Sequence, residues 1–106
     1  MIQITDENWN NGEIVSSKGL TVVKVSASWC GPCKVYGPIF EEYAEKHFSE
    51  DLQFAEADAD ENPDMMKSAG VRAVPTTIIY KDGNVVAKRP GMMSSTDLDE
   101  LIASVK

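Results

Sequence analysis

The stretch Trp29-Cys30-Gly31-Pro32-Cys33-Lys34 holds both cysteines of this 106-residue chain, with two residues between them. A disulfide between Cys30 and Cys33 would close so short a loop that it would add little to the stability of the fold. Two thiols at this spacing can instead form and break a disulfide with little movement of the backbone. The spacing therefore favours redox exchange, for which a Cys-x-x-Cys pair near a βαβ pattern is typical.

Two other interpretations of the cysteine pair stay open from the residues alone. The pair could be half of a structural zinc site, but zinc usually takes four Cys or His ligands and the chain adds only His47. The pair could also be two buried core thiols, although the intervening Gly31-Pro32 and the preceding Trp29 are unusual in a plain core segment. Redox exchange is the favoured interpretation, and no metal site is predicted.

Length and composition predict one domain that spans residues 1–106, because 42% of the residues are hydrophobic and this length supports a single core. The formal net charge of −7 argues against direct binding of nucleic acid, which needs a basic surface. Met1 to Glu7 lacks the basic and apolar regions of a secretory signal, and no apolar run reaches the ~20 residues of a membrane helix. We expect a cytoplasmic monomer without membrane or nucleic-acid partners, in a compartment that keeps thiols reduced.

Hydrophobic periodicity and turn residues predict elements in the order βαβαβαββα. The order indicates a mixed sheet with helices on both faces. Strands are expected over residues 2–4, 20–27, 52–58, 76–80 and 85–88. Helices are expected from Thr5 or Asp6 towards Gly19, from Pro32 to about Phe48, from the cap Asn62 to Gly70, and from a cap at Ser94 or Ser95.

The helices should each bury an apolar stripe. The run Asn10-Asn11-Gly12 predicts an irregular first helix, and Gly37-Pro38 predicts a kink in the second. The residues expected to face the core are Trp9, Ile14, Val15, Val35, Tyr36, Ile39, Phe40, Tyr43, Ala44, Phe48, Met65, Met66, Ala69, Leu98, Leu101, Ile102 and Val105.

The Trp-Cys-Gly-Pro-Cys-Lys motif resembles the active site of the thioredoxin family, and the resemblance covers essentially the whole chain. Strand-like residues precede the motif, Gly37-Pro38 follows it, and Val74-Pro75-Thr76 and Asp82-Gly83 stand at the spacings of the family. The resemblance implies an α/β thioredoxin fold, with a five-stranded mixed sheet in the order 1-3-2-4-5 flanked by four helices.

The resemblance implies a protein-disulfide reductase. A strand that runs into a helix should place Cys30 at the helix N-terminus, where free N–H groups and the helix dipole favour an anion. Cys30 is therefore expected to be the more acidic and more exposed thiol, and the nucleophile, while Cys33 is the more buried, resolving thiol. Disulfide-containing proteins are the expected substrates. A thioredoxin reductase, an NADPH-dependent flavoprotein, would recycle the dithiol, so the chain itself needs no cofactor.

Three further segments are implied to form a substrate groove around the motif. The family's proline is cis at the position of Pro75, which would leave the Val74 backbone free to pair with an extended substrate. Gly91 and Met92 match the third wall of the groove and, with Trp29, would form a flat apolar platform. Filling of the core is the alternative role for the two methionines at 92 and 93.

The sequence departs from the family at two charged positions. Lys24 stands where thioredoxins carry a buried aspartate, and Glu56 stands where they carry a nearby lysine. We expect the two side chains to pair, because an unpaired charge in a buried strand is costly. Glu56 or a neutral Lys24 would then move the proton of Cys33, or a charged Lys24 would favour its thiolate. Ser26, in place of a frequent tryptophan, and Pro90 leave the choice of partner open.

Other functions remain open at this stage. The chain could be a thioredoxin-fold binding subunit whose cysteines are not essential. It could also be an oxidant or isomerase, although such relatives carry histidine between the cysteines and Gly31-Pro32 is typical of the reducing family. Iron–sulfur binding through Cys30 across a dimer is a remote possibility that Pro75 should block.

Overall fold

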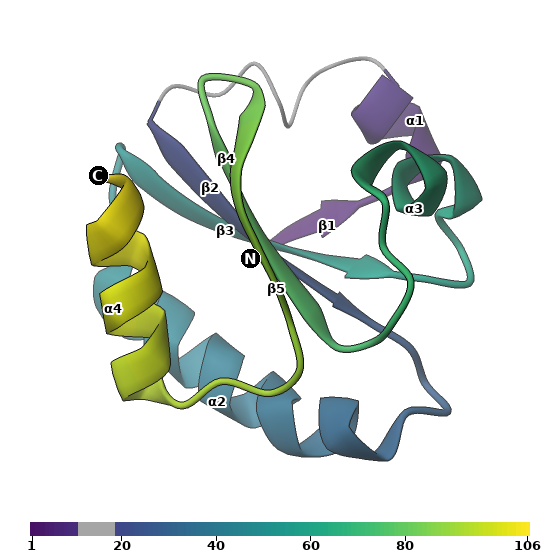
Figure 1. Ribbon diagram of the computed structural model, residues 1–106, viewed down its shortest axis with the longest axis horizontal. Helices are drawn as coiled ribbons and strands as arrows, with labels where there is room; N and C mark the ends of the chain where they lie inside the picture. The colour runs from purple at the N-terminus through teal and green to yellow at the C-terminus, as the bar shows by residue number, and fades with distance from the viewer. Residues whose placement is uncertain (11–18) are drawn as a thin grey trace.

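The computed structural model describes residues 1–10 and 19–106, which form a five-stranded sheet between two pairs of helices (Figure 1). The strand order is β1-β3-β2-β4-β5, with β1, β3 and β2 parallel and β4 and β5 antiparallel to their neighbours. This architecture confirms the predicted fold. The elements are β1 (Ile2–Ile4), α1 (Asp6–Asn10), β2 (Leu20–Ser26), α2 (Gly31–His47), β3 (Leu52–Asp58), α3 (Pro63–Ala69), β4 (Thr76–Lys81), β5 (Asn84–Pro90) and α4 (Ser95–Val105).

The sheet separates two hydrophobic cores. Figure 1 shows α2 and α4 on one side of the sheet and α1 and α3 on the other. Successive side chains of a strand point to opposite faces, so Val22 joins the core under α2 and α4 while Val23 joins the core under α1 and α3. The predicted stripe of α4 is confirmed, because Leu98 and Ile102 are buried and Leu101 and Val105 pack against the same core. Ile14 and Val15, and the predicted irregularity at Asn11-Gly12, lie outside the described residues.

Strand β2 is buried along almost its whole length, as expected for a strand covered by helices on both faces. Lys24 is only 5% exposed, and among the described residues it is the one Lys, Arg, Asp or Glu that is buried. The middle of the sheet therefore contains a cation that needs a partner.

The predicted stripe of α2 is partly wrong. Tyr36, Phe40 and Tyr43 are buried, but Val35 is 55% and Phe48 is 71% exposed. Val35 lies on the solvent side of a helix that packs on one face only. Phe48 follows the last helical residue in an extended conformation (φ −64°, ψ 146°), so helical spacing no longer sets the direction of its side chain.

Helix α3 begins and ends at the predicted residues, but its predicted side-chain cap is absent. Pro63 occupies the first turn and Gly70 ends the helix with φ 68°, as predicted. The predicted side-chain cap by Asn62 is wrong, because its Nδ2 donates to the Asp58 carbonyl at 2.8 Å instead. A local hydrogen bond to the preceding strand end therefore replaces the cap.

The β4–β5 hairpin turns at Asp82 (φ 51°) and Gly83 (φ 87°). Positive φ at both central residues matches the twist of the flanking strands. The second strand of the hairpin, β5, extends beyond the predicted end at Lys88 to Pro90.

Helix α4 begins with a capping box. Ser94 Oγ accepts a hydrogen bond from the Asp97 amide at 3.1 Å, and Asp97 Oδ2 accepts one from the Ser94 amide at 3.1 Å. We expect Ser94→Ala to lower the free energy of unfolding by about 1 kcal/mol, because a helix amide loses its acceptor. Urea denaturation measures the change. Ser104→Ala on the same helix is the matched control, and an equal loss in both variants would contradict the capping role.

Candidate active site

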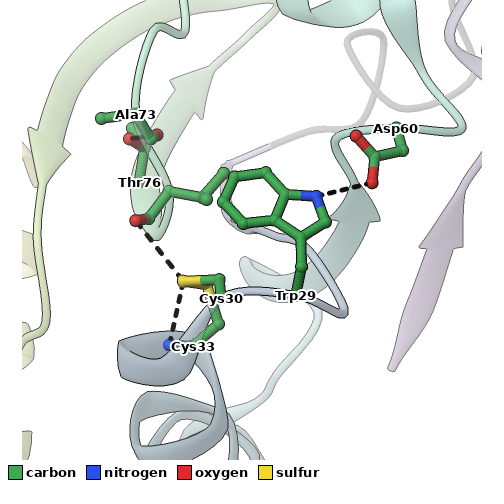
Figure 2. The surroundings of a disulfide bond; sticks show 7 residues. Trp29, Cys30, Cys33, Asp60, Ala73 and Thr76 are labelled. Carbon is green, nitrogen blue, oxygen red and sulfur yellow. Dashed lines mark hydrogen bonds between the residues drawn. A yellow bond between two sulfur atoms is a disulfide. The ribbon is translucent and has the colours of Figure 1, made fainter.

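Cys30 and Cys33 form a disulfide at the start of α2. Cys30 is the N-cap residue of the helix, and the Cys33 amide donates a hydrogen bond to Cys30 Sγ at 3.2 Å (Figure 2). Pro32 lies in the first helical turn, where its missing N–H costs nothing, and both Gly31 and Pro32 are exposed. The Cys30 sulfur therefore lies at the positive end of the helix dipole, which stabilises a thiolate.

The two cysteines are almost equally buried, at 5% exposure for Cys30 and 6% for Cys33. The prediction that Cys30 is the more exposed thiol is wrong for this oxidised state. The reason is that Cys30 packs with Ala27 and Val74, and its sulfur lies 3.6 Å from the Val74 carbonyl oxygen. The position at the helix terminus, and not exposure, therefore distinguishes the two sulfur atoms.

Two hydrogen bonds fix the segment before β4, whose Val74 packs on the cysteines. The Val74–Pro75 peptide bond is cis. The Pro75 carbonyl accepts a hydrogen bond from the Gly91 amide at 2.8 Å, and Thr76 Oγ1 donates to the Ala73 carbonyl at 2.6 Å. Gly91 has φ 94°, which favours glycine at this position. The predicted groove segments therefore meet beside the disulfide.

Trp29 is 68% exposed and held by a partner that the sequence did not reveal. Its Nε1 donates to Asp60 Oδ2 at 2.8 Å, as Figure 2 shows. Asp60 lies 31 residues away along the chain, and no local pattern marked it. Met92 is 47% exposed whereas Met93 is 2% exposed, so Met93 fills the core and Met92 is open to solvent.

Lys24 and Glu56 form the predicted ion pair, with 3.3 Å between Lys24 Nζ and Glu56 Oε2. The side-chain Nε2 of Gln3 donates to Glu56 Oε1. Lys24, Glu56 and Gln3 lie in register across β2, β3 and β1. Lys24 Nζ is 3.6 Å from where a Cβ on Gly37 would lie, about one helical turn beyond Cys33. The ammonium therefore sits beneath the N-terminal half of α2.

The electrostatics of this pair favour an ionised carboxylate. Burial alone would raise the pKa of Glu56, but the hydrogen bond from Gln3 and the charge and hydrogen bond of Lys24 outweigh it and lower the pKa. Glu56 is thus an anion at neutral pH, with both oxygens occupied.

Metal ligation has no support within the described parts of the chain. Residues 1–10 and 19–106 hold no group of three or more His, Cys, Asp or Glu side chains that could bind a metal ion. Across the same residues, no helix has the length and apolar character needed to cross a membrane.

A Cys-x-x-Cys disulfide at a helix N-terminus, on this sheet, is typical of a thiol–disulfide oxidoreductase. Residues 1–104 match the family model for thioredoxin. A thioredoxin of Listeria monocytogenes is 40% identical over 100 residues, covering 94% of this chain and 93% of the relative. A thioredoxin of Coprinus comatus is 33% identical over 102 residues, covering 96% of this chain and 95% of the relative. The chain belongs to the thioredoxin family.

A solved structure supports the same conclusion. The crystal structure of the Malassezia sympodialis thioredoxin superposes with a TM-score of 0.85 at 26% identity, covering 99% of this chain and 90% of that one. The strand order implied by the resemblance is the order observed in this chain.

Proposed function

We propose that this protein reduces disulfide bonds in other proteins and is itself re-reduced by a thioredoxin reductase. The observation that carries the proposal is the hydrogen bond from the Cys33 amide to Cys30 Sγ, which marks Cys30 as the sulfur that the helix terminus stabilises as an anion. Membership of the thioredoxin family supports the same assignment.

The reaction proceeds by two thiol–disulfide exchanges. The Cys30 thiolate attacks one sulfur of a substrate disulfide, forms a mixed disulfide and releases the other substrate sulfur as a thiolate. Cys33 then loses its proton and attacks Cys30 Sγ, which releases the second substrate sulfur. Two electrons pass from the dithiol to the substrate, the released thiolates take up protons, and Cys30 and Cys33 are left joined.

Trp29, Val74, Pro75, Gly91 and Met92 form the substrate groove in this proposal. The hydrogen bond between the Gly91 amide and the Pro75 carbonyl holds two of its walls together. The exposed side chains of Trp29 and Met92 offer an apolar surface, and methionine adapts to partners of varied shape.

Asp60→Ala tests the platform. Removing the acceptor of Trp29 Nε1 frees the indole, and we expect KM for a protein disulfide to rise about two- to fivefold with little change in kcat. Steady-state reduction of insulin measures both constants. Glu61→Gln, at the neighbouring exposed position, is the control. A fall in kcat with constant KM would contradict a positioning role for Asp60.

Lys24 and Glu56 tune the buried thiol in this proposal. The Lys24 ammonium lies beside α2 at Gly37, one helical turn beyond Cys33, so a charged Lys24 favours the thiolate of Cys33. The occupied oxygens and lowered pKa of Glu56 make it the fixed counter-ion of Lys24 and a poor acceptor for the proton of Cys33.

The cellular setting follows from the same chemistry. We place the protein in the cytoplasm as a single-domain monomer, because a reducing compartment keeps a working dithiol available. NADPH acts only on the reductase, so the chain itself carries no cofactor.

Reduction of insulin in the presence of NADPH and a panel of thioredoxin reductases tests the function. We expect NADPH oxidation that depends on both this protein and one of the reductases. If the oxidised protein accepts electrons from no reductase and from no dithiol donor, the proposal is wrong.

A further inference from the structure

A hollow in the surface lies towards the C-terminal end of α2, away from the disulfide. Its volume is about 730 Å³, which is within the range of ligand-binding pockets. It is lined by β1, β3, α2 and the residues that follow α2. Phe48, at its rim, follows Cys33 by 15 residues, roughly 22 Å along a helix. The hollow thus lies away from the disulfide, although Gln3 and Glu56, which belong to the Lys24 ion-pair network, also line it.

The hollow has an apolar floor and an exposed aromatic rim. Phe54 and Ala44 are 4% and 6% exposed and belong to the core, whereas Phe48 is 71% exposed. The Phe48 amide donates to the Ala44 carbonyl at 3.0 Å, which fixes the backbone at the rim. A large apolar side chain held open to solvent beside a hollow is typical of a binding surface.

Three carboxylates line the hollow: Glu56 pairs with Lys24, whereas Glu41 and Glu45 have no ion-pair partner among the described residues. Glu41 and Glu45 both line it and are four residues apart on one face of α2, a spacing at which like charges destabilise a helix. Within residues 1–10 and 19–106, neither side chain takes part in an ion pair. By contrast, Glu42 pairs with Lys46 at 2.9 Å with the same spacing on the next face. A cation from outside would relieve the repulsion between Glu41 and Glu45.

We propose that this hollow binds a segment of a partner protein in which an arginine or lysine lies next to an apolar side chain. The cation sits between Glu41 and Glu45, and the apolar side chain packs on Phe48 above Ala44 and Phe54. The net charge of −7 steers basic segments towards the protein. The same charge repels phosphate groups of nucleic acids and anionic lipids. The arrangement therefore fits a basic protein segment.

Titration of the 15N-labelled, oxidised protein with the peptide acetyl-Arg-Leu-Phe-Arg-amide tests the proposal. We expect chemical-shift changes at the residues that line the hollow, and binding that weakens as salt is added. Two matched peptides serve as controls, one with glutamate in place of both arginines and one with glycine in place of leucine and phenylalanine. Both should bind more weakly.

Substitutions of residues that line the hollow test which side chains contribute to the affinity for the peptide. We expect the double variant Glu41→Gln/Glu45→Gln, and separately Phe48→Ser, to bind the peptide about tenfold more weakly. Glu42→Gln, which does not line the hollow, should bind as the wild type does. Insulin reduction should be unchanged in all three proteins, and the midpoints of thermal unfolding establish that they are folded.

Several results would overturn the proposal. These are shifts confined to the disulfide, equal binding of the glutamate peptide, or an equal loss in Glu42→Gln. Self-association that perturbs the same residues without peptide would assign the hollow to a second copy of the chain instead. None of these results depends on whether the protein reduces disulfides.

Discussion

Cys30→Ser is expected to lower the rate of protein-disulfide reduction by about a thousandfold or more, because the reaction loses its nucleophile. Cys33→Ser should behave differently. Its Cys30 can still attack a substrate, but no second thiol resolves the mixed disulfide, so a covalent complex should accumulate. Insulin reduction measures the rates, and mass spectrometry under non-reducing conditions detects the complex.

The control for these variants is Val35→Ala, an exposed position on the same helix that should retain full activity. A double variant with serine at both cysteines distinguishes reductase from binding subunit. Retention of the biological activity by the double variant would favour the binding subunit. Because the disulfide closes only a short loop, its loss should cost little stability.

Glu56→Gln is expected to lower the free energy of unfolding by about 2–3 kcal/mol, since it leaves the Lys24 ammonium buried without a counter-ion. The value lies below that for a fully buried pair because the Glu56 side chain is 26% exposed. Lys24→Met should cost less, because it removes the buried charge and keeps the apolar stem. Urea denaturation measures both, with Glu100→Gln on the exposed face of α4 as the control. Equal losses in Glu56→Gln and Lys24→Met would contradict the pairing.

The acid limb of the stability curve tests the same pair. The pKa of Glu56 is lowered in the folded state, so the contribution of Glu56 to stability is present above its ordinary pKa of about 4.5. This contribution is lost as the pH falls through the lowered, folded-state pKa. The stability of Glu56→Gln should therefore depend less on pH below about 4.5 than that of the wild type.

The pH–rate profile of disulfide reduction addresses the chemical role of the pair. Loss of the Lys24 charge should raise the pH at which Cys33 becomes reactive, because the nearby cation no longer favours its thiolate. Loss of the Glu56 charge should lower the pH at which Cys33 becomes reactive, because the Lys24 charge is then no longer neutralised. Unchanged profiles in both Lys24→Met and Glu56→Gln would show that the pair is only structural.

Some sequence-based predictions failed where a helix meets its surroundings. The stripe of α2 included Val35 and Phe48, which are both exposed. Periodicity identifies an amphipathic helix. It does not give the width of the helix face that is buried by the rest of the protein, and it does not give the residue at which the last turn ends. Phe48 falls just beyond the helix, and its side chain is exposed beside the hollow for which we propose a binding role.

The chemistry at the start of α2 was readable from the sequence because it depends on near neighbours. A cysteine before Gly31-Pro32 becomes a helix cap, and its partner thiol lies three residues on. The Asp82-Gly83 turn and the Ser94 cap were readable for the same reason, since turns and caps form between residues a few positions apart. The sequence by itself therefore determined the order of elements, the redox pair and these boundaries.

Tertiary structure alone decided the contacts between distant segments. The side chain of Asp60 holds Trp29, Val74 covers Cys30, and Gly91 is tied to Pro75. The opposition of Lys24 and Glu56 was anticipated from charge, but its third member, Gln3, follows from the register of β1 on β3. Register and loop docking depend on how the whole sheet packs, so no local pattern in the sequence contains them.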